Sequence, residues 1–293
     1  MKKAFKRTFL ITLILIVVYF GSILLFFTKS HGMNFFSGES GENGNSTSIL
    51  MLGVDSLNSN DGGNSRSDTM MLLNYNKGSN TFSIVSIPRD TRTVIPGRAN
   101  KERINHAYAY GGAELSLQVV NNLLGTNIKN YLVVDYGLVE KIVDVMGGVK
   151  VEVPQDMHYE DPTANPPLYI DLKQGEQVLN GDESLQLLRF RGYPTADLGR
   201  VQVQQAFMSS FLGKVKSPLT VAKLPLLVKA YGENSNSNVS LNTLFNLFMG
   251  SLKVSDDGIQ GYTLPGEPQM IGGVSYFINY DQQSRELIDQ IMN

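Results

Sequence analysis

The chain has 293 residues, of which 42% are hydrophobic and 18% are charged, and its formal net charge at pH 7 is −2. This composition excludes a disordered chain and a protein that crosses a membrane many times. Because cysteine is absent, disulfides, cysteine-ligated zinc, iron–sulfur clusters and a cysteine nucleophile are excluded too. The three histidines disfavour a histidine-rich metal site. The length allows two ordinary domains, or one large α/β domain with appendages.

An uncharged and mostly apolar run spans residues 9–27. A helix of this length rises about 28 Å, close to the roughly 30 Å hydrocarbon core of a bilayer. Four basic residues precede the run, and they are Lys2, Lys3, Lys6 and Arg7. The positive-inside rule therefore predicts a cytoplasmic tail at 1–8, a transmembrane helix at 9–27 and a chain outside the cell from there on, beginning with a flexible tether at 28–47. The alternative is a cleaved signal peptide, which is disfavoured because no small-x-small motif follows Phe27.

The net charge is an average of two unlike parts. The first 32 residues hold five of the 25 basic residues and none of the 27 acidic ones, which leaves the rest of the chain with a net charge of −7. Binding to nucleic acid requires a basic surface that neutralises phosphates. We therefore expect no nucleic-acid partner for this acidic part.

Along residues 48–293, apolar residues recur either at every second position, which is typical of strands, or at every third to fourth position, which is typical of helices. Strands are expected at 48–55, 69–76, 81–88, 131–135, 149–153, 259–264 and 273–280. Helices are expected at 113–124, 138–146, 182–189, 198–215, 219–231, 241–252 and 282–292, with the fifth kinked or restarted at Pro225. The segment 155–167 reads as a long loop. Strands that alternate with helices predict a single α/β domain, in which helices cover both faces of a mixed sheet.

Arginine is concentrated in two windows of this acidic part. Eight of its nine arginines lie there, namely Arg66, Arg89, Arg92, Arg98, Arg103, Arg189, Arg191 and Arg200. Since the guanidinium group suits bidentate binding of phosphate or carboxylate, the clustering favours one anion site over scattered surface ion pairs. Arg89 ends an apolar strand, where α/β sheets place their ligand crevices. Arg200 and Gln204 are four residues apart, so on a helix they share a face.

Two carboxylates lie at the ends of neighbouring strands. Asp55 ends the first strand, and Asp68 lies at the start of the second. They could share one Mg²⁺ or Mn²⁺, which prefer oxygen ligands and bridge to phosphate. Alternatively, Asp68 caps a turn and Asp55 makes a surface ion pair, and spacing alone favours this second interpretation. Asp90 is interpreted as orienting Arg89, and His106 as a structural hydrogen-bonding residue.

Several motifs follow one another in a familiar order. They are ILMLGVD at 49–55, RSDTMML at 66–72, SIPRDT at 86–91, KERINHAYAYGG at 101–112, VVDYGLVEKIVDVMGGVKVEVP at 133–154, LNGDESLQLLRFR at 179–191 and DLGRVQVQQ at 197–205. In this order the chain resembles the LytR-CpsA-Psr (LCP) family of membrane-anchored cell-wall glycopolymer ligases. The resemblance covers residues 48 to about 216 and the N-terminal anchor.

The resemblance implies a three-layer α/β/α fold with a mixed central sheet and a phosphotransferase activity. The donor would be an anionic glycopolymer, such as wall teichoic acid or capsular polysaccharide, on a polyprenyl-pyrophosphate carrier in the cell membrane. The acceptor would be a muramyl hydroxyl of peptidoglycan, the product a phosphodiester, and the carrier's prenyl tail would lie in an apolar pocket. Two other classes remain open: a regulator that binds polyprenyl pyrophosphate without catalysis, and a lipid pyrophosphatase.

The resemblance also implies roles for individual residues. Asp55 and Asp68 would coordinate Mg²⁺ (or Mn²⁺), and either could activate the acceptor hydroxyl. Arg89 is expected to act in catalysis and to bind the pyrophosphate. The remaining residues expected to bind the pyrophosphate are Arg189, Arg191, Arg200 and Gln204, together with Arg66 and Arg103.

Overall fold

The structure is a computed structural model that describes residues 45–54, 67–164, 167–194 and 197–292. Its strands are β1 (Ser46–Val54), β2 (Ser67–Asn76), β3 (Thr81–Ser86), β4 (Arg92–Val94), β5 (Lys101–Arg103), β6 (Asn130–Val134), β7 (Val149–Val153), β8 (Met157–Asp161), β9 (Leu168–Leu172), β10 (Gly175–Leu179), β11 (Asn236–Ser237), β12 (Ile259–Thr263), β13 (Gly266–Ile271) and β14 (Val274–Asn279). Its helices are α2 (His106–Leu124), α3 (Tyr136–Met146), α4 (Gly181–Arg189), α5 (Asp197–Val215), α6 (Pro218–Ala222), α7 (Leu224–Asn234), α8 (Leu241–Ser251) and α9 (Asp281–Met292), with a short 3₁₀ turn at Asp256–Gly258.

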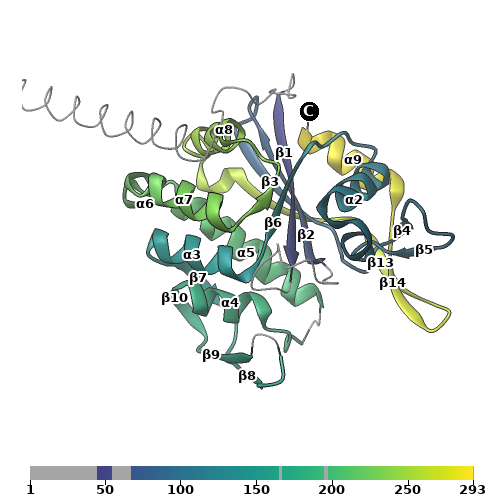
Figure 1. Cartoon of the computed structure of the whole chain (residues 1–293), viewed down its shortest axis with the longest axis horizontal. Coiled ribbons are helices and arrows are strands. Elements are labelled where there is room, and N and C mark those ends of the chain that lie inside the picture. The colour runs from purple at the N-terminus through teal and green to yellow at the C-terminus, as the bar shows by residue number, and fades with distance from the viewer. Residues whose placement is uncertain (1–44, 55–66, 165–166, 195–196, 293) are drawn as a thin grey trace, which may run out of the picture. The chain divides into compact units, whose positions relative to one another are not determined.

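A mixed six-stranded sheet forms the centre, in the order β11-β6-β1-β2-β3-β12 (Figure 1). The β1–β6 and β3–β12 pairs are parallel, and the others are antiparallel. Because β1 lies between two neighbours and is covered on both faces, its sequence is an almost continuous apolar run. The predicted mixed sheet is confirmed.

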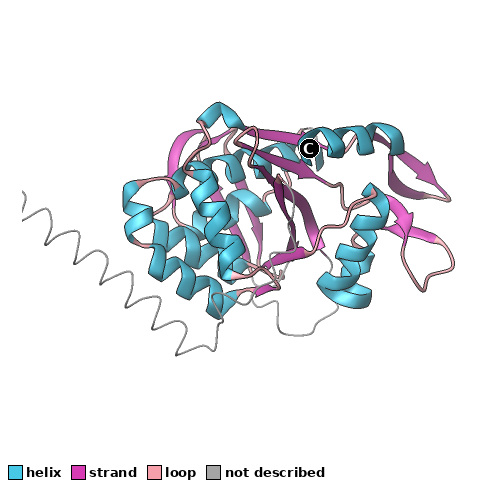
Figure 2. Ribbon diagram, turned by 90° about the horizontal axis from the view of Figure 1, so that it is seen from above, coloured by secondary structure: helices cyan, strands magenta, loops and turns pink. Residues whose placement is uncertain are grey.

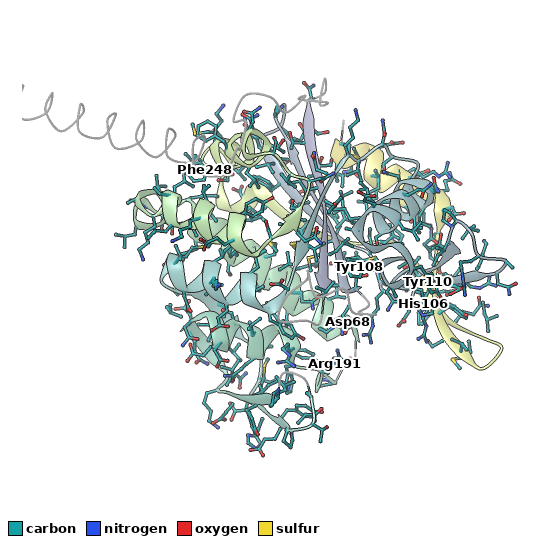
Figure 3. The ribbon with its side chains drawn as sticks, viewed as in Figure 1. Asp68, His106, Tyr108, Tyr110, Arg191 and Phe248 are labelled. Carbon is teal, nitrogen blue, oxygen red and sulfur yellow. The ribbon has the colours of Figure 1, made fainter. Side chains whose placement is uncertain are left out.

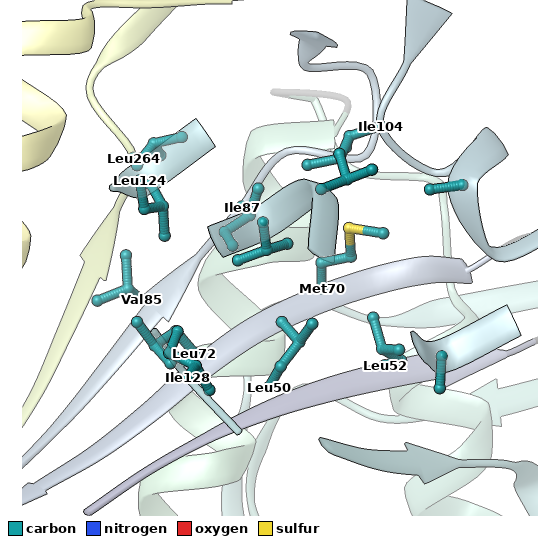
Figure 4. Close-up of a cluster of buried hydrophobic side chains, with 14 of the residues drawn as sticks. Leu50, Leu52, Met70, Leu72, Val85, Ile87, Ile104, Leu124, Ile128 and Leu264 are labelled. Atoms are coloured by element: carbon teal, nitrogen blue, oxygen red, sulfur yellow. The ribbon is translucent and has the colours of Figure 1, made fainter. Parts of the chain in front are cut away.

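Helices cover both faces of this sheet (Figures 1 and 2). On one face, Leu50 and Leu52 of β1 lie in a buried cluster (Figure 4). The same cluster includes Val119 of α2 and Ile288 of α9. On the other face, Met51 packs with Met71 and Ile84 against Met208 and Leu212 of α5. Alternate residues of β1 thus point to opposite layers, as the period of a strand requires. The chain therefore has the expected three-layer arrangement.

A second buried cluster lies beside the sheet. It joins α3, α4 and α5 to two small antiparallel pairs, β7 with β10 and β8 with β9, through Val151, Ile170, Leu187 and Phe207. Apart from 240–242, the described residues belong to one compact unit of residues 41–239 and 243–293.

Several expectations from the sequence need correction. The segment 155–167 is not one long loop, because β8 occupies residues 157–161 and pairs with β9. The strands β4, β5, β9, β10, β11 and β13 were also not expected. The helix 219–231 does restart near Pro225, since α6 ends at Ala222 and α7 begins at Leu224.

The predicted transmembrane segment at 9–27 lies outside the described residues. Within the described ranges, no helix is both long and apolar enough to cross a bilayer.

Candidate active site

Asp68 on β2 is held between two arginines. Arg89 Nη1 donates to Asp68 Oδ1 at 2.9 Å, and Arg191 Nη2 donates to Oδ2 at 2.8 Å. Figure 3 shows Asp68 and Arg191 near one another. The antiparallel pairing of β2 with β3 brings the chain just after β3 close to Asp68, and the Ile87 amide still donates to the Met70 carbonyl at 2.9 Å. Asp68 and Arg89 are each 26% exposed, so both are accessible to a ligand.

Helix α5 supplies two further polar side chains to the same place. Arg200 Nη2 lies 3.4 Å from the Asp68 carbonyl oxygen, and Gln204 Nε2 donates to Thr69 Oγ1 at 3.0 Å. Their spacing of four residues puts both on the face of α5 that meets β2, as the sequence predicted. Arg200 is only 6% exposed. Burial raises the pKa of the nearby Tyr193 hydroxyl to about 12, and the charge of Arg200 opposes this shift.

A cavity of about 440 Å³ opens beside Asp68. Its interior is mostly apolar, with Met51, Met71, Val139, Leu188, Phe207 and Met208 among its walls. Its polar lining includes Asp68, Thr69, Arg189, Arg191, Arg200 and Gln204. Arg89 lines a small adjoining hollow that shares Asp68, Arg200 and Gln204. The site can therefore accept an amphiphile that joins an apolar chain to an anionic group.

The end of α4 places two arginines on this cavity. Helix α4 begins with a capping box between Asn180 and Glu183, and the residue that follows it, Phe190, has an extended backbone. Arg189 is thus the last helical residue, and its guanidinium lies 4.4 Å from the centre of the Tyr136 ring. Arg191 turns instead to Asp68, and both arginines line the cavity.

The structure does not bring every predicted residue together. Asp55 and Arg66 lie outside the described residues. Arg103 is on β5, where its Nε lies 3.2 Å from Asp90 Oδ1 and its Nη2 donates to the Ser275 carbonyl at 2.8 Å. Asp90, expected to orient Arg89, is thus paired with Arg103. Among the described contacts, Arg103 makes none with Asp68, and it lines neither of the two hollows beside Asp68.

Sequence reasoning missed other residues of the cavity. Tyr136, Tyr159 and Asp161 line it but belong to no arginine window. For Tyr159 and Asp161 the signal was the alternation of apolar and polar residues at 157–161, which the prolines that follow obscured. His106 has the expected structural role, because its Nδ1 lies 2.9 Å from Glu102 Oε2.

The carboxylate of Asp68 is the described group that could contribute ligands to a divalent cation. Both carboxylate oxygens already accept from arginine, but each oxygen has a second lone pair. Mg²⁺ is commonly held by one or two carboxylates together with substrate phosphates. Among the described residues, no group of three or more acidic or histidine side chains could hold a metal ion by itself. Asp68 therefore fits a cation whose coordination the substrate completes.

Comparison with known proteins adds independent information. The model of the LytR_cpsA_psr family matches residues 28–293. A protein of Bacillus anthracis named polyisoprenyl-teichoic acid–peptidoglycan teichoic acid transferase TagU is 32% identical over 253 residues, which cover 83% of this chain and 77% of that protein. The Bacillus subtilis protein of the same name is 29% identical, over 78% of this chain and 72% of that one.

Solved structures show the same fold. Bacillus subtilis TagV superposes with a TM-score of 0.73 at 24% identity, covering 86% of this chain and 98% of that one. TagT bound to LIIa-WTA gives a TM-score of 0.68 at 27% identity, covering 88% and 94%.

Proposed function

Since the chain belongs to the LytR-CpsA-Psr family, we propose that it transfers an anionic glycopolymer from a polyprenyl-pyrophosphate carrier to a muramyl hydroxyl of peptidoglycan. The observation that carries this proposal is the arginine-held carboxylate of Asp68 beside an apolar cavity. Relatives named as teichoic acid transferases support the choice of a glycopolymer, either wall teichoic acid or a similar anionic polymer.

The cavity and its arginines match the two halves of such a carrier. The apolar walls suit a prenyl chain, whose burial is favourable by about 25 cal/mol per Å² of apolar surface. Arg89, Arg189, Arg191 and Arg200 suit the pyrophosphate, because guanidinium groups bind phosphate oxygens through paired donors. Gln204 adds an uncharged donor beside them.

The transfer step follows from this arrangement. The acceptor oxygen attacks the phosphorus atom that bears the glycan, a new phosphorus–oxygen bond forms, and the bond to the second phosphate breaks. The prenyl monophosphate leaves with the electron pair. Phosphoryl transfer depends on neutralising the charge of the phosphate oxygens rather than on a covalent nucleophile, and the arginines supply that charge.

The hydroxyl proton needs an acceptor close to the phosphates. Asp68 is the described carboxylate that the arginines orient, and Asp55 is the other candidate. Mg²⁺ held by Asp68, with Asp55, would supply further charge neutralisation on the pyrophosphate when bound.

The expected anchor belongs to the same proposal. A single membrane helix at 9–27 with a cytoplasmic N-terminus would hold residues 48–293 at the outer leaflet, where a lipid-linked donor and peptidoglycan meet.

The test uses the purified full-length chain in detergent, a short synthetic prenyl-pyrophosphate glycan and a peptidoglycan oligomer, with products identified by mass. The proposal predicts a phosphodiester between glycan and oligomer together with prenyl monophosphate. Release of a free phosphorylated glycan would identify a lipid pyrophosphatase instead. Binding that leaves donor and acceptor unchanged would identify a regulator that only sequesters the carrier.

A further inference from the structure

The β8–β9 hairpin carries an aromatic ring to the edge of the cavity. In the pairing of β8 with β9, Met157 faces Leu172 and Tyr159 faces Ile170. Met157, Ile170 and Leu172 are buried in the second cluster, so this is the inward face of the hairpin. Residues two apart on a strand share a face, which puts Tyr159 and Asp161 on that inward face as well.

Tyr159 lies where the packed core ends. It lines the cavity, yet it remains 49% exposed. A residue on an inward face that is half exposed stands at an opening, so its ring borders the cavity mouth. Tyr169, which faces Glu160 across the same hairpin, lies on the outward face and is 58% exposed.

Asp161 is a fixed carboxylate next to this ring. Three donors converge on its Oδ1: the Thr163 hydroxyl at 2.7 Å, the Thr163 amide at 3.0 Å and the Ala164 amide at 3.1 Å. These hydrogen bonds, with a smaller contribution from the charge of Arg189, lower the pKa of Asp161, so the group is ionised at neutral pH. Because the three bonds all go to Oδ1, Oδ2 is the oxygen that a ligand would use.

An aromatic ring and an oriented carboxylate are together suited to bind a sugar. The ring offers a rigid apolar surface for the C–H face of a pyranose, and the carboxylate accepts hydrogen bonds from its hydroxyls. Both groups line the same cavity as Arg189 and Arg191. A carrier bound to those arginines would present its first sugar at this mouth.

We propose that Tyr159 and Asp161 form a subsite for the sugar that is joined directly to the donor pyrophosphate. This inference rests on the proposed function, because it assigns one part of the donor to a part of the same cavity. It makes Tyr159 and Asp161 determinants of donor specificity.

The test compares two ligands on the full-length chain in detergent by titration calorimetry. One ligand is a short-chain prenyl pyrophosphate, and the other is the same carrier bearing one N-acetylhexosamine. The wild type should bind the sugar-bearing carrier more tightly. The gain is the ratio of the Kd of the bare carrier to that of the sugar-bearing carrier. In Tyr159→Ala this ratio should fall by about tenfold while the Kd of the bare carrier stays the same, as is typical when a contributing aromatic contact is truncated. Asp161→Asn should also reduce the gain.

Tyr169→Ala is the matched control, because it removes a ring of similar exposure from the other face of the same hairpin. It should retain the full gain. An equal gain in Tyr159→Ala and the wild type would overturn the proposal, as would a loss of the same size for both ligands, which would assign Tyr159 to the prenyl chain. If Tyr159→Ala instead raised only the KM for the peptidoglycan oligomer, the sugar bound there would belong to the acceptor, and the proposal would again fail.

The same titration separates this proposal from the proposed function. If the wild-type chain bound neither carrier, the proposed function would fail and this inference with it. If it bound both carriers equally well, only the sugar subsite would be wrong.

Discussion

Arg191 and Asp68 are 123 positions apart in the sequence, yet Arg191 Nη2 donates to Asp68 Oδ2 at 2.8 Å. This contact joins the central sheet to the segment between α4 and α5. Arg89, which lies just after β3, donates to the other carboxylate oxygen, Asp68 Oδ1. The two arginines thus fix a carboxylate at a cavity edge and are themselves placed to meet an incoming pyrophosphate.

Replacement of Asp68 by asparagine should separate binding from catalysis. Asp68→Asn keeps the size of the side chain but removes its negative charge. We expect affinity for the prenyl-pyrophosphate carrier to be kept or increased, because the arginines no longer share their charge with a carboxylate. Transfer should fall by about 10²–10⁴-fold, the range for loss of a general base. Asp156→Asn, on the exposed surface beside Lys173, is the control and should retain transfer. An undiminished rate in Asp68→Asn would exclude Asp68 as base and as metal ligand.

Removal of divalent cations should lower transfer by the wild-type chain. Asp68 fits a cation only together with substrate phosphates, so the metal requirement should appear in turnover rather than in folding. We expect EDTA to reduce the transfer rate, Mg²⁺ or Mn²⁺ to restore it, and the melting temperature to stay constant. Transfer that EDTA leaves unchanged would remove the cation from the mechanism.

Replacement of Arg103 tests whether this residue stabilises the fold, as its contacts indicate, or binds the pyrophosphate, as the family resemblance implies. Its guanidinium binds the Ser275 carbonyl and Asp90, which ties β5 to β14. Arg103→Ala should therefore cost about 1–2 kcal/mol of unfolding free energy, discounted for its partial exposure, and leave transfer largely intact. Thermal melting and the transfer assay measure the two effects. If Arg103→Ala lost transfer but kept its melting temperature, the pyrophosphate-binding role of Arg103 would be supported instead.

Glu102 should make stability depend on pH in the acid range. Hydrogen bonds from His106, Tyr110 and Arg98 lower the pKa of Glu102 from 4.5 to about 2. A lowered pKa in the folded state means that the stabilising contribution is complete above pH 4.5 and is lost as the pH falls toward 2. The difference in melting temperature between the wild type and Glu102→Gln should therefore be constant near neutral pH and shrink between pH 4.5 and pH 3. A difference that stayed the same down to pH 3 would contradict this account of Glu102.

The parts of the site that depend on local periodicity were predictable. The four-residue spacing of Arg200 and Gln204 correctly placed both side chains on one face of a helix. The apolar run at 48–55 likewise predicted a strand, which the structure shows as β1.

The parts that depend on distant partners were not. Residues 157–161 form a strand because Met157 and Ile170 are buried against α4 and α5, and the short alternation at 157–161 does not identify those distant partners. Arg103 belongs to a family motif, but its partner Ser275 lies 172 positions away.

The most direct measurement compares transfer by Arg191→Ala and Arg98→Ala with that of the wild type, on the same donor and peptidoglycan oligomer. Both arginines are exposed and paired with a carboxylate, but Arg98 pairs with Glu102 rather than Asp68. We predict that Arg191→Ala lowers the transfer rate by about 10²–10³-fold, the usual loss for one group that stabilises developing charge, and that Arg98→Ala retains it. Wild-type transfer by Arg191→Ala, or an equal loss in both variants, would contradict the assignment of this cavity as the site of transfer.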